Sequence, residues 1–214
     1  MAILTKGLLS ITGISGRIGD LVYSMRDGKQ CVRSRPRKRA GKPSEGQLLH
    51  RARFRAASQV LCRFTPLLNL GFRHPRVLAG GYNQAVSYAL GNALIGSYPN
   101  FRMDFSKMLF SSGPLEAAQQ PQASSIGVES ICFIWNYIRW SNPRDDDKAI
   151  LIAVCEDPLL YFFTDASAVR KDRIGFLHVP GMAGRKAHVY IGFVDAQGKR
   201  AANSAYLGEL MITM

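Results

Sequence analysis

The sequence predicts an α+β protein with an N-terminal β-hairpin and helices, followed by an antiparallel β-sandwich of the immunoglobulin-like or fibronectin-like type. An Asp-Gly pair interrupts a stretch of alternating side chains, two amphipathic helical patterns come next, and the second half has hydrophobic runs with a period of two. The chain has 214 residues, 47% of them hydrophobic, enough to bury a core without metal ions or disulfide bonds. We expect a basic hairpin-plus-helical region at residues 1–107 and a sandwich domain at residues 108–214.

The hairpin lies within residues 18–35. Asp27 and Gly28 separate two extended segments, and both residue types tolerate the positive φ angles of a tight two-residue turn. Alternation along the first strand places every second side chain on one face. These side chains are Leu21, Tyr23 and Met25.

A basic segment follows, in which six of the ten residues from Arg33 to Lys42 are Lys or Arg. Because like charges repel and Pro36 disfavours helix in the residue before it, we expect an exposed, extended arm. The basic residues of the arm are Arg33, Arg35, Arg37, Lys38, Arg39 and Lys42.

Two helices are predicted after the arm. Ser44 and Gln47 have the spacing of a capping box, so the first helix should begin there and end at about Phe64. Arg53 falls within the apolar side of this helix. Either its head group reaches water or a carboxylate at the edge of the core, or this side of the helix also contacts a partner. The apolar side consists of Leu49, Phe54, Ala56, Ala57, Val60, Leu61 and Phe64, and Arg51 and Arg55 lie opposite.

The second helix is expected within residues 78–95, after a loop marked by Pro66, Gly71 and Pro75. Residues 115–125 are polar and indicate a linker or long loop. Six β-branched or aromatic runs follow, and residues 108–111 are expected to add a seventh strand. The six runs are residues 126–135, 149–155, 159–163, 174–179, 187–194 and 204–212.

Four cysteines are scattered without a C-x-x-C pair, and we interpret Cys132 and Cys155 as buried free thiols beside Trp135, a core anchor. The N-terminus has no signal-peptide pattern, and no run is long enough to span a bilayer, so a cytoplasmic protein without membrane contact is expected.

The positive charge is concentrated in the N-terminal third. The chain has 28 Lys and Arg against 15 Asp and Glu, a formal net charge of +13. Up to Arg76 there are 16 basic and three acidic residues, whereas the remainder has 12 of each. Because general solubility does not require such asymmetry, the first third is expected to bind an anionic partner.

Nucleic acid is the first candidate partner. Arginine pairs with phosphate through two parallel hydrogen bonds, and neutralised phosphates release counterions. Arg51 and Arg55 would extend the surface of the arm. Tyr23 is the only aromatic residue near the arm, which favours contacts to the backbone with little sequence preference.

Two other interpretations remain open. In the first, the arm straps onto an acidic surface of a neighbouring subunit, and the chain is a structural protein of a homo-oligomer or a phage-like particle. Alternatively, the charge serves solubility alone.

Catalytic and metal-binding patterns are missing from the sequence, so we expect no enzyme, cofactor or metal site. No histidine has a metal-ligand spacing, although His178 and His188 would meet if their strands were neighbours. The run from Asp145 to Asp147 lacks the alternation of a calcium loop and is interpreted as a solvated turn. There is no G-x-S-x-G element and no cysteine in a nucleophile signature.

A set of short motifs is distributed along the chain: Gly16-x-x-Gly19, Gly28-Lys29-Gln30, Arg33-Ser34-x-Pro36, Pro43, Gln47, Arg51, Phe54, Val189-Tyr190-x-x-Phe193 and Asn203-Ser204. Together these motifs resemble a bacterial family of basic proteins of this length whose function is unassigned. The resemblance covers nearly the whole chain and implies a hairpin and helical region before a β-sandwich, and it supplies no activity or cofactor. Relatives typically have Asn-Pro-x-Thr before the first long helix, where this chain has Lys42-Pro43-Ser44-Glu45.

Overall fold

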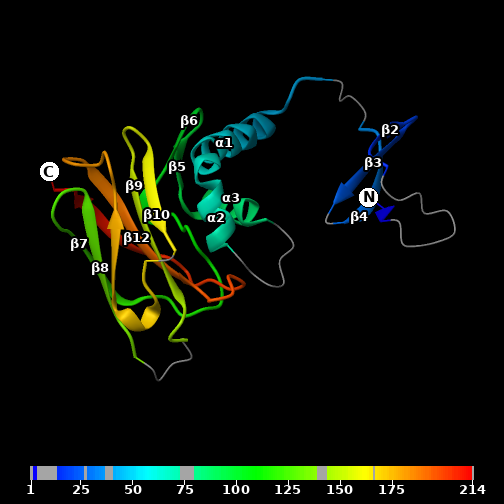
Figure 1. Ribbon diagram of the computed structural model, residues 1–214. Helices are drawn as coiled ribbons and strands as arrows, with labels where there is room; N and C mark the ends of the chain where they lie inside the picture. Colours follow the sequence, from blue (N-terminus) through cyan, green and yellow to red (C-terminus); the bar gives the residue numbers. More distant parts are fainter. Residues whose placement is uncertain are drawn as a thin grey trace. The chain divides into compact units, whose positions relative to one another are not determined.

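The computed structural model divides the chain into two compact units, residues 1–43 and 44–214 (Figure 1). This division differs from the expected boundary after residue 107, because the helices share a core with the sandwich. The structure describes residues 2–3, 14–26, 28–36, 41–72, 80–138, 144–165 and 167–213.

The first unit is a four-stranded antiparallel sheet with the strand order β1-β4-β3-β2. Arg26 pairs with Lys29 and Gly28 has a φ of 73°, so β3 and β4 form the predicted hairpin; Asp27 lies outside the described residues. The strands are β1 (Ala2–Ile3), β2 (Gly16–Ile18), β3 (Leu21–Arg26) and β4 (Lys29–Ser34).

The second unit begins with helices. Ser44 caps the first helix by accepting a hydrogen bond from the backbone N–H of Gln47, which confirms the predicted start. Pro66 lies in the first turn of a further short helix, where its missing N–H costs nothing, so the loop predicted there is wrong. The elements are α1 (Glu45–Leu61), η1 (Cys62–Phe64), α2 (Thr65–Gly71) and α3 (Gly81–Asn92).

A hairpin of β5 (Leu94–Ser97) and β6 (Asn100–Met103) and the short helix η2 (Phe105–Lys107) lead into the sandwich. The predicted strand at residues 108–111 is not formed. Instead, the Ser204 hydroxyl accepts hydrogen bonds from the backbone N–H groups of Phe110 (3.0 Å) and Ser111 (3.4 Å), which fastens this segment to the sandwich.

The sandwich consists of a three-stranded sheet, β11-β8-β7, and a four-stranded sheet, β10-β9-β12-β13. Every strand pair named in either sheet is antiparallel, as in fibronectin type III domains. The seventh strand is β7, in the segment predicted as a linker. The strands are β7 (Gln119–Ser125), β8 (Ser130–Asn136), β9 (Lys148–Cys155), β10 (Leu160–Thr164), β11 (Ile174–His178), β12 (Lys186–Val194) and β13 (Ala205–Met211), with η3 (Arg170–Asp172) before β11.

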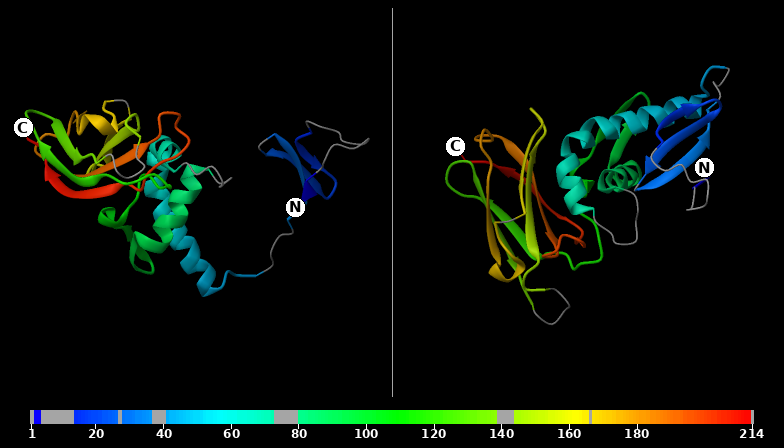
Figure 2. Two further views of the ribbon diagram at one scale, coloured as in Figure 1. Left: turned by 90° about the horizontal axis from the view of Figure 1, so that it is seen from below. Right: turned by 45° about the vertical axis from the view of Figure 1, so that its right-hand side comes forward.

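The four-stranded sheet is buried on both faces. Leu151 and Ala153 of β9 face the three-stranded sheet, whereas Ile150 and Ile152 pack against the helices on the other side. Figures 1 and 2 show the helices and the three-stranded sheet on opposite sides of the four-stranded sheet. The second unit therefore has three layers: the helices, the four-stranded sheet and the three-stranded sheet. Separating the helices from the sandwich would expose the hydrophobic core between the helices and the four-stranded sheet. As predicted, Trp135, Cys132 and Cys155 are buried, and both cysteines are free thiols.

None of the helices in the described ranges combines the length and hydrophobicity of a transmembrane span.

Candidate nucleic-acid interface

One face of the N-terminal sheet is basic. Val22 in β3 is paired with Arg17 in β2 and with Arg33 in β4, so these three side chains lie in a row on the same face. Lys29 is four residues before Arg33 in β4, and alternation puts it on that face too. Arg17, Lys29 and Arg33 are all exposed. We call these three residues the basic face.

The opposite face is apolar. The register pairs Ile18 with Leu21, and alternation along β3 adds Tyr23 and Met25. Ile18, Leu21 and Met25 are exposed. The sheet therefore separates charge from hydrophobic surface, and the predicted side of Leu21, Tyr23 and Met25 is confirmed.

The arm begins later than predicted. Arg33 belongs to β4 because Val22 pairs with it, and the backbone N–H of Arg35 donates to the carbonyl of Asp20 at 2.7 Å. The side chains of Arg35 and Lys42 are exposed. The other predicted arm residues, Arg37, Lys38 and Arg39, lie outside the described residues.

Helix α1 carries the other two predicted residues, Arg51 and Arg55, and both are exposed. Arg53 points to the core edge, where its Nη2 donates to the carbonyl of Leu90 at 2.7 Å. A cation there interacts favourably with the C-terminal end of α3. Arg53 thus lies at the core edge as expected, but its partner is a backbone carbonyl and not the expected water or carboxylate.

The predicted apolar side of α1 is only partly covered. Ala57, Leu61 and Phe64 are buried, but Leu49 and Phe54 are exposed, as is Leu48. The periodicity is correct, but it does not reveal where along the helix the core begins. The first three turns of α1 thus combine exposed apolar and basic side chains.

The basic residues of the N-terminal third are unpaired in the described part of the chain. Every ion pair found there involves residues beyond position 100. Intramolecular neutralisation by carboxylates would have removed the basis for an external partner. No carboxylate of a described residue forms an ion pair with the guanidinium group of any of Arg17, Arg33, Arg35, Arg51 and Arg55.

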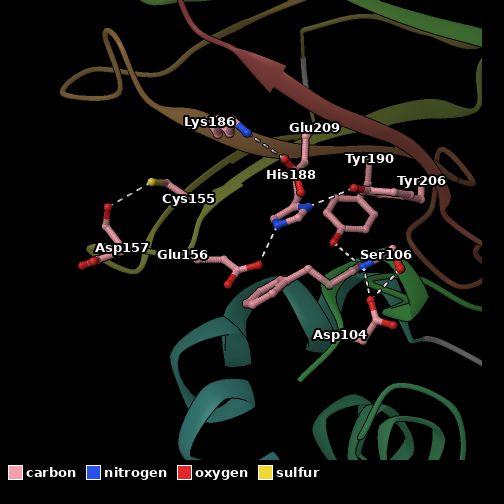
Figure 3. Close-up of polar contacts among 11 residues, drawn as sticks. Asp104, Ser106, Cys155, Glu156, Asp157, Lys186, His188, Tyr190, Tyr206 and Glu209 are labelled. Atoms are coloured by element: carbon pink, nitrogen blue, oxygen red, sulfur yellow. Dashed lines mark hydrogen bonds and ion pairs between the residues drawn. The ribbon is translucent and has the colours of Figure 1, made fainter. Parts of the chain in front are cut away.

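The sandwich contains a separate polar cluster around His188 (Figure 3). Its Nδ1 lies 2.9 Å from the hydroxyl of Tyr206, its Nε2 lies 2.7 Å from a carboxylate oxygen of Glu156, and the ring stacks on Phe105. The Tyr190 hydroxyl donates to the carbonyl of Phe105. Together these contacts fasten η2 to the four-stranded sheet.

The contacts of this cluster indicate a structural role. Both ring nitrogens of His188 are engaged, and burial, together with Glu209, Asp104 and Glu156, raises the pKa of Tyr206, which keeps its hydroxyl protonated. The condition for a contact between His178 and His188, that their strands are neighbours, is not met, because β11 and β12 belong to different sheets.

Asp147 is also not the solvated residue that was predicted. It is fully buried, and its Oδ2 accepts a hydrogen bond from Nε of Arg170 at 3.2 Å. The Arg170 guanidinium lies 3.8 Å from the centre of the Phe193 ring. Throughout the described ranges, no group of three His, Cys, Asp or Glu side chains is arranged to hold a metal ion.

Arg17, Lys29 and the exposed Phe54 were not among the predicted site residues. Strand pairing is the signal that identifies the first two.

Comparisons with known proteins identify a family but no activity. The profile described as "Family of unknown function (DUF6266)" matches residues 13–208. A comparison with curated proteins finds no match. Among solved structures, the chicken CNTN1 FN1-FN3 domains are similar over 49% of this chain, with 6% sequence identity and a TM-score of 0.35. The aligned region spans 34% of that structure's chain.

Proposed function

This chain belongs to DUF6266, a family of unknown function, so we infer its function from its own residues. We propose that the protein binds nucleic acid without catalysis, and that it contacts the phosphate backbone of the nucleic acid with little sequence preference. The observation that carries this proposal is the set of exposed basic residues without carboxylate partners in the described N-terminal part. Besides the basic face, these residues are Arg35 and Lys42 in the first unit and, separately, Arg51 and Arg55 on α1 of the second unit.

The physical reason is counterion release. Each phosphate that an Arg or Lys neutralises frees condensed cations, so binding weakens as salt concentration rises. A chain that engages six phosphates of a duplex should give a slope of about −5 for log K against log salt concentration. Base sequence should change the affinity little, because phosphate contacts carry no sequence information.

Fluorescence anisotropy with labelled random-sequence duplexes and single strands, over a salt series, tests the proposal. We expect binding at low salt, a steep negative slope and similar affinities for unrelated sequences. A slope near zero, or no binding at low salt, would exclude this function.

A second candidate, assembly with other copies of the chain, is favoured by the outer face of the three-stranded sheet. Ile134, Ile174 and Phe176 are exposed in the middle of this face, and Ile134 pairs with Ile174. The side chains around them are uncharged: Gln122, Ser124, Ser130, Asn136 and His178. In a chain with a net charge of +13, a face without Lys, Arg, Asp or Glu allows two copies to meet with little charge repulsion.

Sedimentation velocity tests this candidate. Self-association that is lost in a Phe176→Ser variant but retained in a control on the other sheet, Gln197→Ala, would support assembly; Gln197 is exposed and follows β12. A monomer at all concentrations would exclude it. Deletion of residues 33–42 distinguishes two modes of self-association. Association through the outer face of the three-stranded sheet should persist in the deletion variant, whereas association through an arm that straps onto a neighbour should be lost.

A further inference from the structure

Phe54 is an exposed aromatic residue within a basic part of α1. Its side chain is 51% exposed, although the helical periodicity places it in line with the core. Arg51 lies one turn before it, at i−3, so it adjoins Phe54 on the helix surface, and it is exposed. Arg55 is also exposed and lies about 100° further round the helix axis. No carboxylate pairs with either arginine in the described part of the chain.

We propose that Phe54 is a base-stacking residue, and that α1 binds single-stranded nucleic acid in preference to a duplex. This inference rests on the proposed function for the class of partner. It goes beyond that function because it assigns a contact to bases and a preference for one form of nucleic acid.

The combination of side chains selects the partner. An apolar protein surface that covered Phe54 would also bring the adjoining Arg51 out of water without a counter-charge, which is costly. A single strand meets both needs: its phosphates pair with Arg51 and, further round the helix, with Arg55, and an unpaired base presents a flat π-face to the ring. In a duplex the base faces are already stacked on each other and are not accessible.

Stacking on Phe54 also fits weak sequence dependence, because every base has a π-face. The sequence alone placed Phe54 in the core and left Tyr23 as the only aromatic residue near the arm. The exposed ring therefore adds a contact that a backbone-only interface lacks.

The test compares Phe54→Leu with Phe176→Leu in the full-length protein. Phe176 is the matched control because it is 53% exposed, on β11 of the sandwich. We expect Phe54→Leu to weaken binding of a labelled oligothymidylate by at least about fivefold, with an unchanged salt slope, and to leave duplex binding unchanged. Phe176→Leu should bind like the wild type.

A conservative variant separates stacking from a general loss of surface. Phe54→Trp should retain the affinity for the single strand, and its added tryptophan fluorescence should be quenched when oligothymidylate saturates the protein. The same substitution at Phe176 should show no such quenching.

The outcomes distinguish this inference from the proposed function. If Phe54→Leu binds the single strand like the wild type, with the same steep salt slope, the stacking role is wrong while nucleic-acid binding stands. Equal weakening of duplex binding would overturn the preference for single strands. If the wild type binds neither form, both proposals fail. A loss of binding to a polyglutamate peptide in Phe54→Leu, with single-strand binding intact, would assign α1 to an acidic protein instead.

Discussion

The buried ion pair between Asp147 and Arg170 should make the sandwich sensitive to the loss of either partner alone. Their exposed fractions are 0% and 3%, and Oδ1 of Asp147 has no hydrogen-bond partner among the described residues, so its charge is stabilised mainly by Arg170. Arg170→Met leaves that carboxylate buried and unpaired, and also removes the hydrogen bond to the Glu116 carbonyl. Breaking such a pair costs about 3–5 kcal/mol, which corresponds to a fall of about 6–20 °C in Tm.

Urea denaturation followed by circular dichroism measures this loss. Lys186→Met is the matched control, because it removes one partner of the exposed pair with Glu209 and should cost less than about 1 kcal/mol. The double variant Arg170→Met with Asp147→Leu should recover most of the lost stability, since no buried charge remains. A loss in Arg170→Met as small as in the control, or no recovery in the double variant, would refute the reasoning.

The pH dependence gives a second test of the same pair. Burial raises the pKa of Asp147, and Arg170 opposes that shift, so the pKa should rise further in Arg170→Met. A carboxyl group with a raised folded-state pKa adds stability below its unfolded pKa of about 3.9, and this contribution is lost as the pH rises through the folded pKa. The deficit of Arg170→Met should therefore be largest at pH 7 and shrink toward pH 4. A deficit that is constant with pH would contradict a buried, ionised Asp147.

Two further predictions concern other buried polar groups. Burial tends to raise the pKa of Asp195, but hydrogen bonds from the backbone N–H groups of Arg200 and Lys199 outweigh it and lower the pKa. The carboxylate therefore stabilises the fold above its unfolded pKa, and this stability is lost as the pH falls through the lowered pKa. Asp195→Asn should be destabilised in urea by about 1–2 kcal/mol at pH 7 and progressively less toward pH 3; a deficit that grows in acid would contradict this sign. Ser204→Ala leaves two buried backbone N–H groups without an acceptor and should lower the free energy of unfolding by about 1–3 kcal/mol, whereas a loss no larger than that of Ser124→Ala would show that the hydroxyl does not hold the segment.

Local signals predicted much of the fold. The Asp27-Gly28 turn and the Ser44 cap each depend on a few neighbouring residues, and six sandwich strands follow from hydrophobic runs. Strand β7 was missed because its residues are polar or small on both faces, so it has no apolar run. The helix at Pro66 was missed because proline both interrupts and begins helices.

The candidate site was harder to predict because it depends on pairing between distant residues. Lys29 and Arg17 join Arg33 only through the register of three strands, and the short β2 gives little sequence signal. Arg170 lies 23 residues from Asp147, so the aspartate run looked like a solvated turn. The exposure of Phe54 depends on where the core ends along α1, which helical periodicity does not determine.

The salt dependence of nucleic-acid binding in a charge-neutralised variant tests the central claim most directly. The variant replaces Arg17, Lys29 and Arg33 with Gln, and a matched control replaces the exposed sandwich residues Arg144, Lys171 and Lys199 in the same way. Loss of three phosphate contacts should make the duplex slope of log K against log salt shallower by about 2.7, while the control keeps the wild-type slope. Identical slopes in the variant, the control and the wild type would contradict the assignment of the basic face as a phosphate-binding surface.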